Sequence, residues 1–301
     1  MARRPLFAVV PNFSEGRRTD VMDAICAALQ VPGARLVYRQ ADAGHHRLDT
    51  TVLGDADAVA RSAMAGARVA VSLIDMTHHA GGHPRMGAVD VIPFVPLRAA
   101  SMPDAIALAR GFGRDLADAL DLPVYLYDRA ALVPERASLA IVRKGEYEGL
   151  REAVALGERL PDFGPHAIGP AGATAVGARE PLIAFNMYLS GTDEAAAKQI
   201  ATTIRESSGG LPALRAIGFG VPERSCVTVS MNLIDHRVTG LVAAYDAVVA
   251  WASPMGMDVL DSEIVGLVPE AALDGGVAEH VRLEGFDPDG QILERLAEED
   301  T

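Results

Sequence analysis

The alternation of apolar and polar positions divides the chain into short segments of strand and helix. Residues 6–10 form a continuous apolar run typical of a buried strand, and residues 19–30 carry apolar side chains at helical spacing. Further strands are predicted at 35–41, 50–54, 89–97 and 124–127, and further helices at 55–73, 102–120 and 146–159, with Asp55 as a helix cap. Pro93 and Pro96 make the 89–97 segment an expected edge or broken strand, because proline cannot donate to a sheet ladder.

Residues 160–177 interrupt this regularity. The stretch is rich in Gly and Pro and has no hydrophobic period, which predicts a loop or linker. A second series follows, with strands expected at 182–189, 214–221, 227–235 and 262–268, helices at 193–207 and 240–251, and a last helix from Pro269. This β-α-β-β-α-β order is the split pattern of a ferredoxin-like domain, and the first half contains the same series with one more helix and strand. We therefore predict an α+β protein of two ferredoxin-like βαββαβ domains, residues 1–178 and 179–301.

Composition narrows the class of protein. The chain has 301 residues, half of them hydrophobic and 22% charged, as in a soluble globular protein. Its net charge is −13 and it lacks a run of Lys and Arg, which argues against a nucleic-acid partner. The apolar run before Pro11 is too short for a signal peptide, and no window approaches a membrane span of about 20 apolar residues. Two distant cysteines, Cys26 and Cys226, fit a reducing cytoplasm.

The stretch 73–90 carries the densest chemistry. His83 stands between Gly82 and Pro84, and proline biases the residue before it toward an extended conformation, so we expect an imidazole held on a loop. An imidazole in a cleft can move a proton near pH 7. The alternative is a structural or solvent-exposed histidine. Arg85 offers a guanidinium for a substrate, or else pairs with Asp75 or Asp90.

Two polar clusters follow the first and second predicted strands. They are Asn12, Ser14 and Glu15 in the first, and Asp42, His45, His46 and Arg47 in the second. Arg47 can bind a carboxylate bidentately, and Asp42 can orient an imidazole. The alternative interpretation is structural: ordinary turns and a helix cap for the first cluster, and a solvated loop for the second.

Three other features allow weaker inferences. His78, His79 and His83, with His45, His46 and Asp42, are ligand types for zinc, but the spacing matches no metal motif, so we expect no metal. The glycines of residues 164–179 match no nucleotide-binding motif, although they would let a flat ligand approach the backbone. Asn186 and Asn232 occupy predicted strands, where Asn is depleted, and could face a cleft or solvent. Together these groups suit group transfer or hydrolysis at a planar carbon.

Several motifs resemble the glutamate formiminotransferase family. They include Val-Pro-Asn-Phe-Ser-Glu-Gly (10–16), His-Pro-Arg-Met-Gly-Ala (83–88), Pro-Asp-Phe-Gly-Pro (161–165) and Gly-Ala-Thr-Ala-Val-Gly-Ala-Arg (172–179), and they run in order over nearly the whole chain. The resemblance implies a homodimer that transfers the formimino group of N-formimino-L-glutamate to N5 of tetrahydrofolate in histidine degradation. Animal members carry a fused cyclodeaminase domain, and this chain resembles the stand-alone bacterial kind.

The resemblance also assigns roles to residues. The family's catalytic histidine falls on His83. Its folate-contacting loop falls on Gly164, Pro165, His166, Ala167, Ile168, Gly169, Pro170, Ala171 and Gly172. Two departures stand out: His46 replaces the usual Asn, and the folate loop is slightly short and carries His166.

The expected mechanism uses His83 as general acid and base, helped by Asp42 and Arg85. Substrate binding is expected of Arg47, His45, His46, Asn12, Ser14, Glu15 and Asn186. Two alternatives are a related enzyme with another donor, such as N-formiminoglycine, and a non-catalytic folate-binding or metal-binding module.

Overall fold

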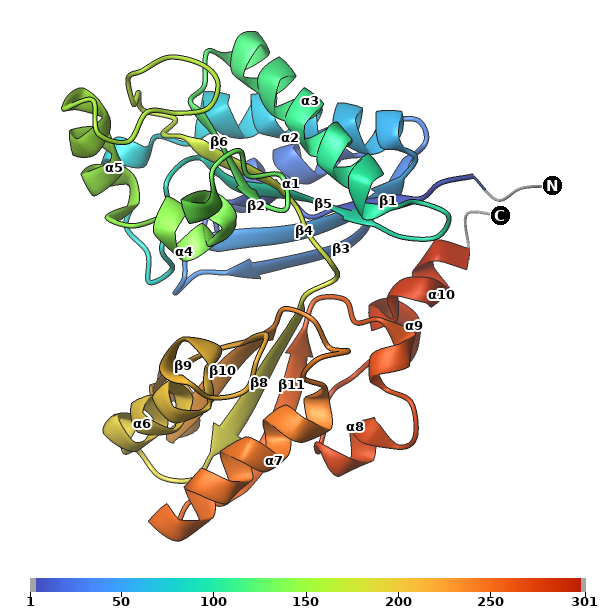
Figure 1. Ribbon diagram of the computed structural model, residues 1–301, viewed down its shortest axis with the longest axis vertical. Coiled ribbons are helices and arrows are strands. Elements are labelled where there is room, and N and C mark those ends of the chain that lie inside the picture. Colours follow the sequence, from blue (N-terminus) through green and yellow to red (C-terminus); the bar gives the residue numbers. More distant parts are fainter. Residues whose placement is uncertain (1–3, 299–301) are drawn as a thin grey trace. The chain divides into compact units, whose positions relative to one another are not determined.

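A computed structural model describes residues 4–298, and the chain divides between Arg179 and Glu180 into two compact units (Figure 1). We call them unit 1 and unit 2. Each unit has its own β-sheet and its own hydrophobic core. The protein is therefore a mixed α/β protein with two sheets. Among residues 4–298, no helix is both long enough and apolar enough to cross a membrane.

Unit 1 is built on a mixed sheet. Its strands are β1 (Phe7–Val9), β2 (Asn12–Phe13), β3 (Ala34–Asp42), β4 (Arg47–Gly54), β5 (Val89–Pro96), β6 (Val124–Asp128) and β7 (Thr174–Ala178). Its helices are α1 (Thr19–Leu29), α2 (Ala56–Leu73), α3 (Met102–Leu120), α4 (Leu139–Val142) and α5 (Glu146–Ala155). β4 pairs in antiparallel fashion with β3 on one side and with β1 and β2, which follow one another along the same line, on the other. β5 is antiparallel to β1 and β2, β7 is parallel to β5, and β6 is parallel to β7.

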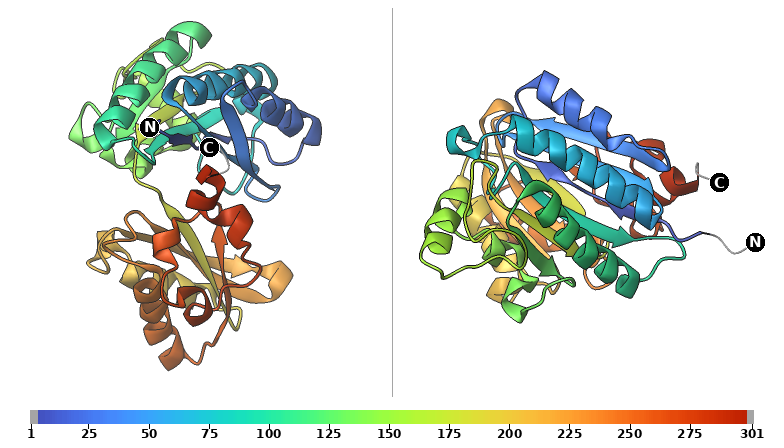
Figure 2. Two further views of the ribbon diagram at one scale, coloured as in Figure 1. Left: turned by 90° about the vertical axis from the view of Figure 1, so that its right-hand side faces the viewer. Right: turned by 90° about the horizontal axis from the view of Figure 1, so that it is seen from above.

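Helices α1, α2 and α3 lie side by side over one face of this sheet (Figure 2). Their apolar faces bury Ile25, Leu29 and Leu116 against Phe13 and Phe94 of the strands. The predicted cap is confirmed, because the side chain of Asp55 accepts a hydrogen bond from the Ala58 amide at 2.9 Å. This packing leaves the strand ends and their loops to carry the polar residues.

Two expectations about unit 1 are wrong. The 89–97 segment is an interior strand, because it pairs with β1 and β2 on one side and with β7 on the other. Pro93 is tolerated there because it lies opposite residues 10 and 11, where the neighbouring strand is broken between β1 and β2. The missing amide hydrogen of Pro93 therefore costs no ladder bond to that neighbour. The supposed linker contains β7, whose short run of small residues gives no strand pattern; it is buried between β5 and β6.

Unit 2 contains an antiparallel sheet in the order β11-β8-β10-β9. Its strands are β8 (Ile183–Leu189), β9 (Leu214–Val221), β10 (Cys226–Leu233) and β11 (Val259–Val265). Its helices are α6 (Glu194–Ile204), α7 (Leu241–Ala252), α8 (Val277–His280), α9 (Pro288–Gln291) and α10 (Leu293–Glu298). Alternate residues of β8 are buried, which matches a sheet with helices on one face. Instead of one helix from Pro269, the chain forms a 3₁₀ turn and these short helices.

Gly172 is required by the close packing of two backbones. It has φ +76°, and a Cβ at this position would lie 2.4 Å from the Met86 carbonyl oxygen. Gly172→Ala should therefore lower the free energy of unfolding by more than the ~1–2 kcal/mol of left-handed strain alone. Gly157→Ala is the control, since Gly157 has φ +77° and open space around it. Urea denaturation measures both; equal losses would contradict the packing argument.

Candidate functional site

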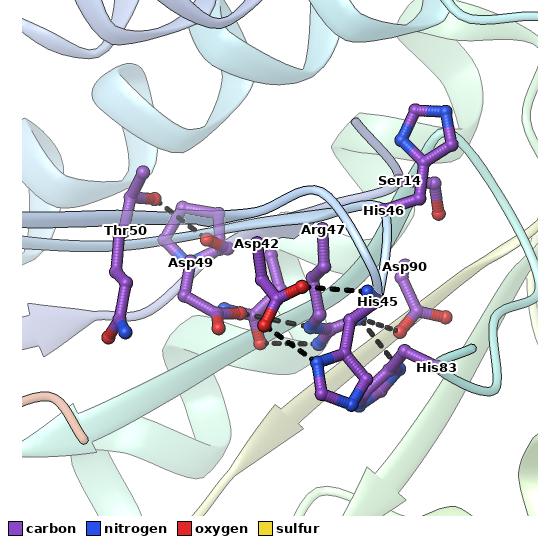
Figure 3. Close-up of polar contacts among 12 residues, drawn as sticks. Ser14, Asp42, His45, His46, Arg47, Asp49, Thr50, His83 and Asp90 are labelled. Carbon is purple, nitrogen blue, oxygen red and sulfur yellow. Dashed lines mark hydrogen bonds and ion pairs between the residues drawn. The ribbon is translucent and has the colours of Figure 1, made fainter. Parts of the chain in front are cut away.

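The guanidinium of Arg47 lies at the centre of a polar network in unit 1 (Figure 3). Arg47 begins β4 and is 7% exposed. Its Nη1 donates to Asp90 at 2.7 Å, its Nη2 to the Asn12 side-chain oxygen at 2.8 Å, and its Nε to Asp49 at 2.9 Å. Adjacent strands β2, β4 and β5 supply these partners, so the register of the sheet sets the geometry of the network.

Asp90 is the buried anion of the network. It lies on β5 with no exposed surface and accepts hydrogen bonds from Arg47, Arg143 and the Met86 amide. Burial alone would raise the pKa of this carboxyl, but the guanidiniums of Arg143 and Arg47 outweigh burial and hold the pKa below its usual range. Asp90 therefore stays ionised and fixes two arginines at once.

His83 lies directly against this network. Its Nδ1 is 2.7 Å from the Pro84 carbonyl oxygen and 3.3 Å from Nη1 of Arg47. A carbonyl oxygen can only accept, so Nδ1 carries the hydrogen and Nε2 keeps its lone pair. Burial, followed by the positive charges of Arg47 and Arg143, lowers the pKa of His83 to about 3. The imidazole is therefore neutral at pH 7, and its Nε2 can accept a proton.

His45 and Asp42 form a second imidazole–carboxylate pair beside His83. The carboxylate of Asp42 lies 2.8 Å from Nδ1 of His45 and also accepts the His45 amide hydrogen at 2.7 Å. The rings of His45 and His83 meet edge to face with centroids 6.2 Å apart. Asp42 thus orients His45 rather than His83.

His46 points away from His83, as Figure 3 shows. Its Nδ1 accepts the Gly16 amide hydrogen at 3.0 Å, and its ring stacks on His79 with centroids 4.3 Å apart. The backbone of His46 is left-handed, with φ 54°, a conformation in which Asn and His are enriched. This backbone geometry suits both His46 and the Asn that the resemblance leads us to expect here, and the side chain lies outside the His83 network.

Ser14 and Glu15 support the loop that follows β2. The Ser14 hydroxyl donates to the Gly87 carbonyl at 2.8 Å, and both side chains are buried. Glu15 accepts the amide hydrogens of Arg17 and Arg18 at 2.9 and 3.0 Å, just before α1 begins. These contacts match the turn interpretation of the two residues, but neither side chain caps α1, whose N-cap residue is Arg18 and has no side-chain capping bond.

Arg85 lies in a different environment from Arg47. Its guanidinium donates to Glu146 at 2.6 Å and to Glu148 at 2.7 Å, not to Asp75 or Asp90 as the sequence suggested. These groups line an open pocket of ≈ 460 Å³ together with residues 79–81 and 145. Arg85 therefore joins the loop after His83 to the start of α5.

Residues 164–172 pack against the loop that carries His83. The carbonyl oxygens of Pro170 and Ala171 accept the amide hydrogens of Met76 and Ala88 at 2.7 and 2.8 Å. A Cβ at Gly164 would lie 2.3 Å from the chain's own backbone, whereas Gly169 has open space around it. The first glycine is thus required by the fold, whereas Gly169 is exposed and a side chain there would meet no neighbour. His166 and Ala167 are exposed, and Pro165 and Ile168 are partly exposed.

Asn186 lies on β8 in unit 2, whereas the residues above belong to unit 1. Its side chain donates to Glu263 at 2.9 Å, and the hydroxyl of Tyr188 donates to the same carboxylate at 2.6 Å. The described residues contain no group of three or more His, Cys, Asp or Glu side chains arranged to hold a metal ion.

Sequence reasoning missed the roles of three members of the network, Asp49, Asp90 and Arg143. Asp90 is a lone carboxylate in an otherwise apolar strand, Val-Asp-Val-Ile, and this pattern is itself a signal of a paired buried charge. Arg143 follows α4 in a stretch that has no motif, so its approach to Asp90 depends on the tertiary fold.

The comparison with known families identifies the chain. The model of the formiminotransferase domain, N-terminal subdomain, matches residues 6–179, and that of the formiminotransferase domain matches residues 184–284. The chain belongs to the formiminotransferase family. Within it, the chain is 41% identical over 296 residues to the glutamate formimidoyltransferase of Thermoplasma acidophilum, covering 97% of each chain.

Two further relatives agree with the family assignment. The glutamate formimidoyltransferase of Streptococcus pyogenes serotype M1 is 38% identical, with 95% of this chain and 96% of the relative covered. The formimidoyltransferase-cyclodeaminase of Rattus norvegicus is 43% identical over 89% of this chain, which spans 51% of that longer relative.

The depressed pKa of His83 predicts a neutral ring across the physiological range. Because the unfolded chain binds a proton below about pH 6.5 and the folded chain only near pH 3, His83 should make the protein less stable as pH falls between these values. Nitrogen NMR of the imidazole, assigned by comparison with His83→Gln, should show the Nδ1–H tautomer from pH 5 to 8. A titration midpoint near 6.5 would contradict the assigned environment.

Proposed function

We propose that the protein is a glutamate formimidoyltransferase that moves the formimino group of N-formimino-L-glutamate to N5 of tetrahydrofolate. The observation that carries this proposal is the neutral His83, whose Nδ1–H is fixed by a carbonyl and whose Nε2 is left as a base. The names of two relatives that match nearly the whole chain support the same reaction.

In the proposed mechanism, N5 of tetrahydrofolate attacks the formimino carbon and a tetrahedral intermediate forms. Nε2 of His83 takes the proton from N5 and returns one to the glutamate nitrogen as its bond to carbon breaks. One C–N bond forms, one breaks, and no electrons leave the substrates. The amidinium-like carbon is already electrophilic, so the chemistry requires only proton transfer and orientation.

Other residues position the groups that react. Arg47 holds a positive charge beside His83, and the Asp42–His45 pair presents a second oriented imidazole. Such fixed charges act on substrate with no further rearrangement. Residues 164–172 are proposed to contact the folate, and the free space around Gly169 supports a flat ligand lying against the backbone there. In this account Arg85 acts as a positioning residue.

We also infer that each unit contains a ferredoxin-like arrangement. In unit 2 the order β11-β8-β10-β9 supports it, since the fourth strand lies beside the first and the third lies between the first and second. In unit 1 the order β5, β1, β4, β3 supports the same arrangement, with β7 and β6 added beyond β5.

His83→Ala should lower kcat about 10²–10⁴-fold, because it removes the general base. The assay follows formation of 5-formiminotetrahydrofolate by absorbance, with N-formimino-L-glutamate and N-formiminoglycine as parallel donors. His78→Ala is the matched control, since this loop histidine has an 85% exposed side chain. Near-normal turnover in His83→Ala would refute the role of His83. Preference for N-formiminoglycine would favour the other donor, and folate binding without turnover would favour a binding module.

A further inference from the structure

The charges around His83 do not balance. The single buried carboxylate of Asp90 is shared by the guanidiniums of Arg47 and Arg143. The other carboxylate on Arg47 belongs to Asp49, whose side chain is 36% exposed and therefore screened by water. The network consequently leaves surplus positive charge beside the imidazole, in a protein whose net charge is −13.

Arg143 has unused capacity to donate hydrogen bonds. Its Nη2 donates to Asp90, while its buried Nε has no hydrogen-bond partner among the described residues. A buried donor without an acceptor costs about 1–3 kcal/mol, so an acceptor supplied by a ligand would be favourable. Arg47, by contrast, already uses Nε, Nη1 and Nη2 on Asp49, Asp90 and Asn12.

The segment that carries Arg143 is held on both sides. The guanidinium of Arg159 donates to the carbonyl oxygens of Ile141, Val142 and Lys144 around the end of α4. On the other side, Arg85 pairs with residues 146 and 148, and its carbonyl oxygen accepts the amide hydrogen of residue 147 at 2.9 Å. Arg143 is therefore pre-organised, which lowers the entropic cost of binding a ligand.

We propose that Arg143, assisted by the field of Arg47, binds the α-carboxylate of the formimino donor. The proposal rests on the proposed function and assigns the donor's recognition to a residue outside the sequence motifs. A guanidinium forms strong, charge-assisted bonds to a carboxylate, and Arg143 shares the Asp90 carboxylate with Arg47, whose Nη1 lies 3.3 Å from the His83 imidazole. The α-carboxylate is the donor anion nearest that nitrogen, because a single carbon separates the two groups.

The test compares Arg143→Gln and Arg143→Lys with Arg151→Gln, a control at an exposed position on α5. Loss of a charged hydrogen bond should raise the KM for N-formimino-L-glutamate about 10–100-fold in Arg143→Gln. The KM for tetrahydrofolate should stay within about twofold. The donor KM of Arg143→Lys should fall between those of the wild type and Arg143→Gln, because lysine keeps the charge without the planar fork. With N-formiminoglycine as donor, the ratio of the variant KM to the wild-type KM should be the same, since this donor has the same α-carboxylate.

An unchanged donor KM in Arg143→Gln, or an equal rise in the KM for both substrates, would overturn the proposal. Thermal melting checks that each variant is folded, and Arg143→Lys carries the test if Arg143→Gln is not. Calorimetric binding of L-glutamate separates this proposal from the proposed function. If the wild-type protein binds L-glutamate more tightly than Arg143→Gln does but turns over neither donor, only the proposed function is overturned. If the wild-type protein binds L-glutamate no more tightly than Arg143→Gln does, the carboxylate site is overturned.

Discussion

The buried carboxylate of Asp90 is the constraint on which the candidate site depends. It lies on the interior strand β5 and forms ion pairs with Arg47, at the start of β4, and with Arg143, in the segment after α4. Removing one partner of a buried ion pair typically costs about 3–5 kcal/mol, because the remaining charge has lost its compensation. The ends of two strands and a distant loop are thereby fixed relative to one another, and His83 lies against the result.

This arrangement has an electrostatic consequence for catalysis. Burial, together with the positive charges that would attract an anionic substrate, lowers the pKa of His83 to about 3 in the free protein. Asp90 opposes this effect, but two arginines outweigh one carboxylate. An anion bound between Arg47 and Arg143 would offset part of their charge, so His83 would become a stronger base once the donor is in place. Substrate binding and base strength are then linked through one cluster.

Local patterns in the sequence predicted the parts of the fold that depend on local chemistry. The helix capped by Asp55 and the alternating strand β8 were recognisable because period and capping are properties of neighbouring residues. β7 was mistaken for a linker, because its short run of small residues has no period and its burial is imposed by β5 and β6. Pro93 led to the wrong expectation of an edge or broken strand for a related reason. The break in the neighbouring strand that accommodates this proline lies some 80 residues earlier in the chain.

In the candidate site, too, local patterns predicted some residues, whereas the roles of others depend on tertiary packing. His83 and Arg47 were found from loop composition and motif resemblance. The alternative partners expected for Arg85, Asp75 or Asp90, were wrong. Its actual partners, Glu146 and Glu148, lie more than 60 residues away, and no local rule connects them to Arg85. Arg143 could not be found from its surroundings in the sequence. Ion pairs between distant segments are decided by tertiary packing, which a single sequence does not display.

The most direct test of this account is a double-mutant cycle in kcat with Asp90→Asn and His83→Ala. If Asp90 acts by positioning the groups around His83, Asp90→Asn should lower kcat in the otherwise wild-type protein but cause little further loss when His83 is already Ala. Circular dichroism at the assay temperature confirms that each variant is folded. Fully multiplicative losses in the double variant would contradict the account, because they would mean that Asp90 and His83 contribute independently.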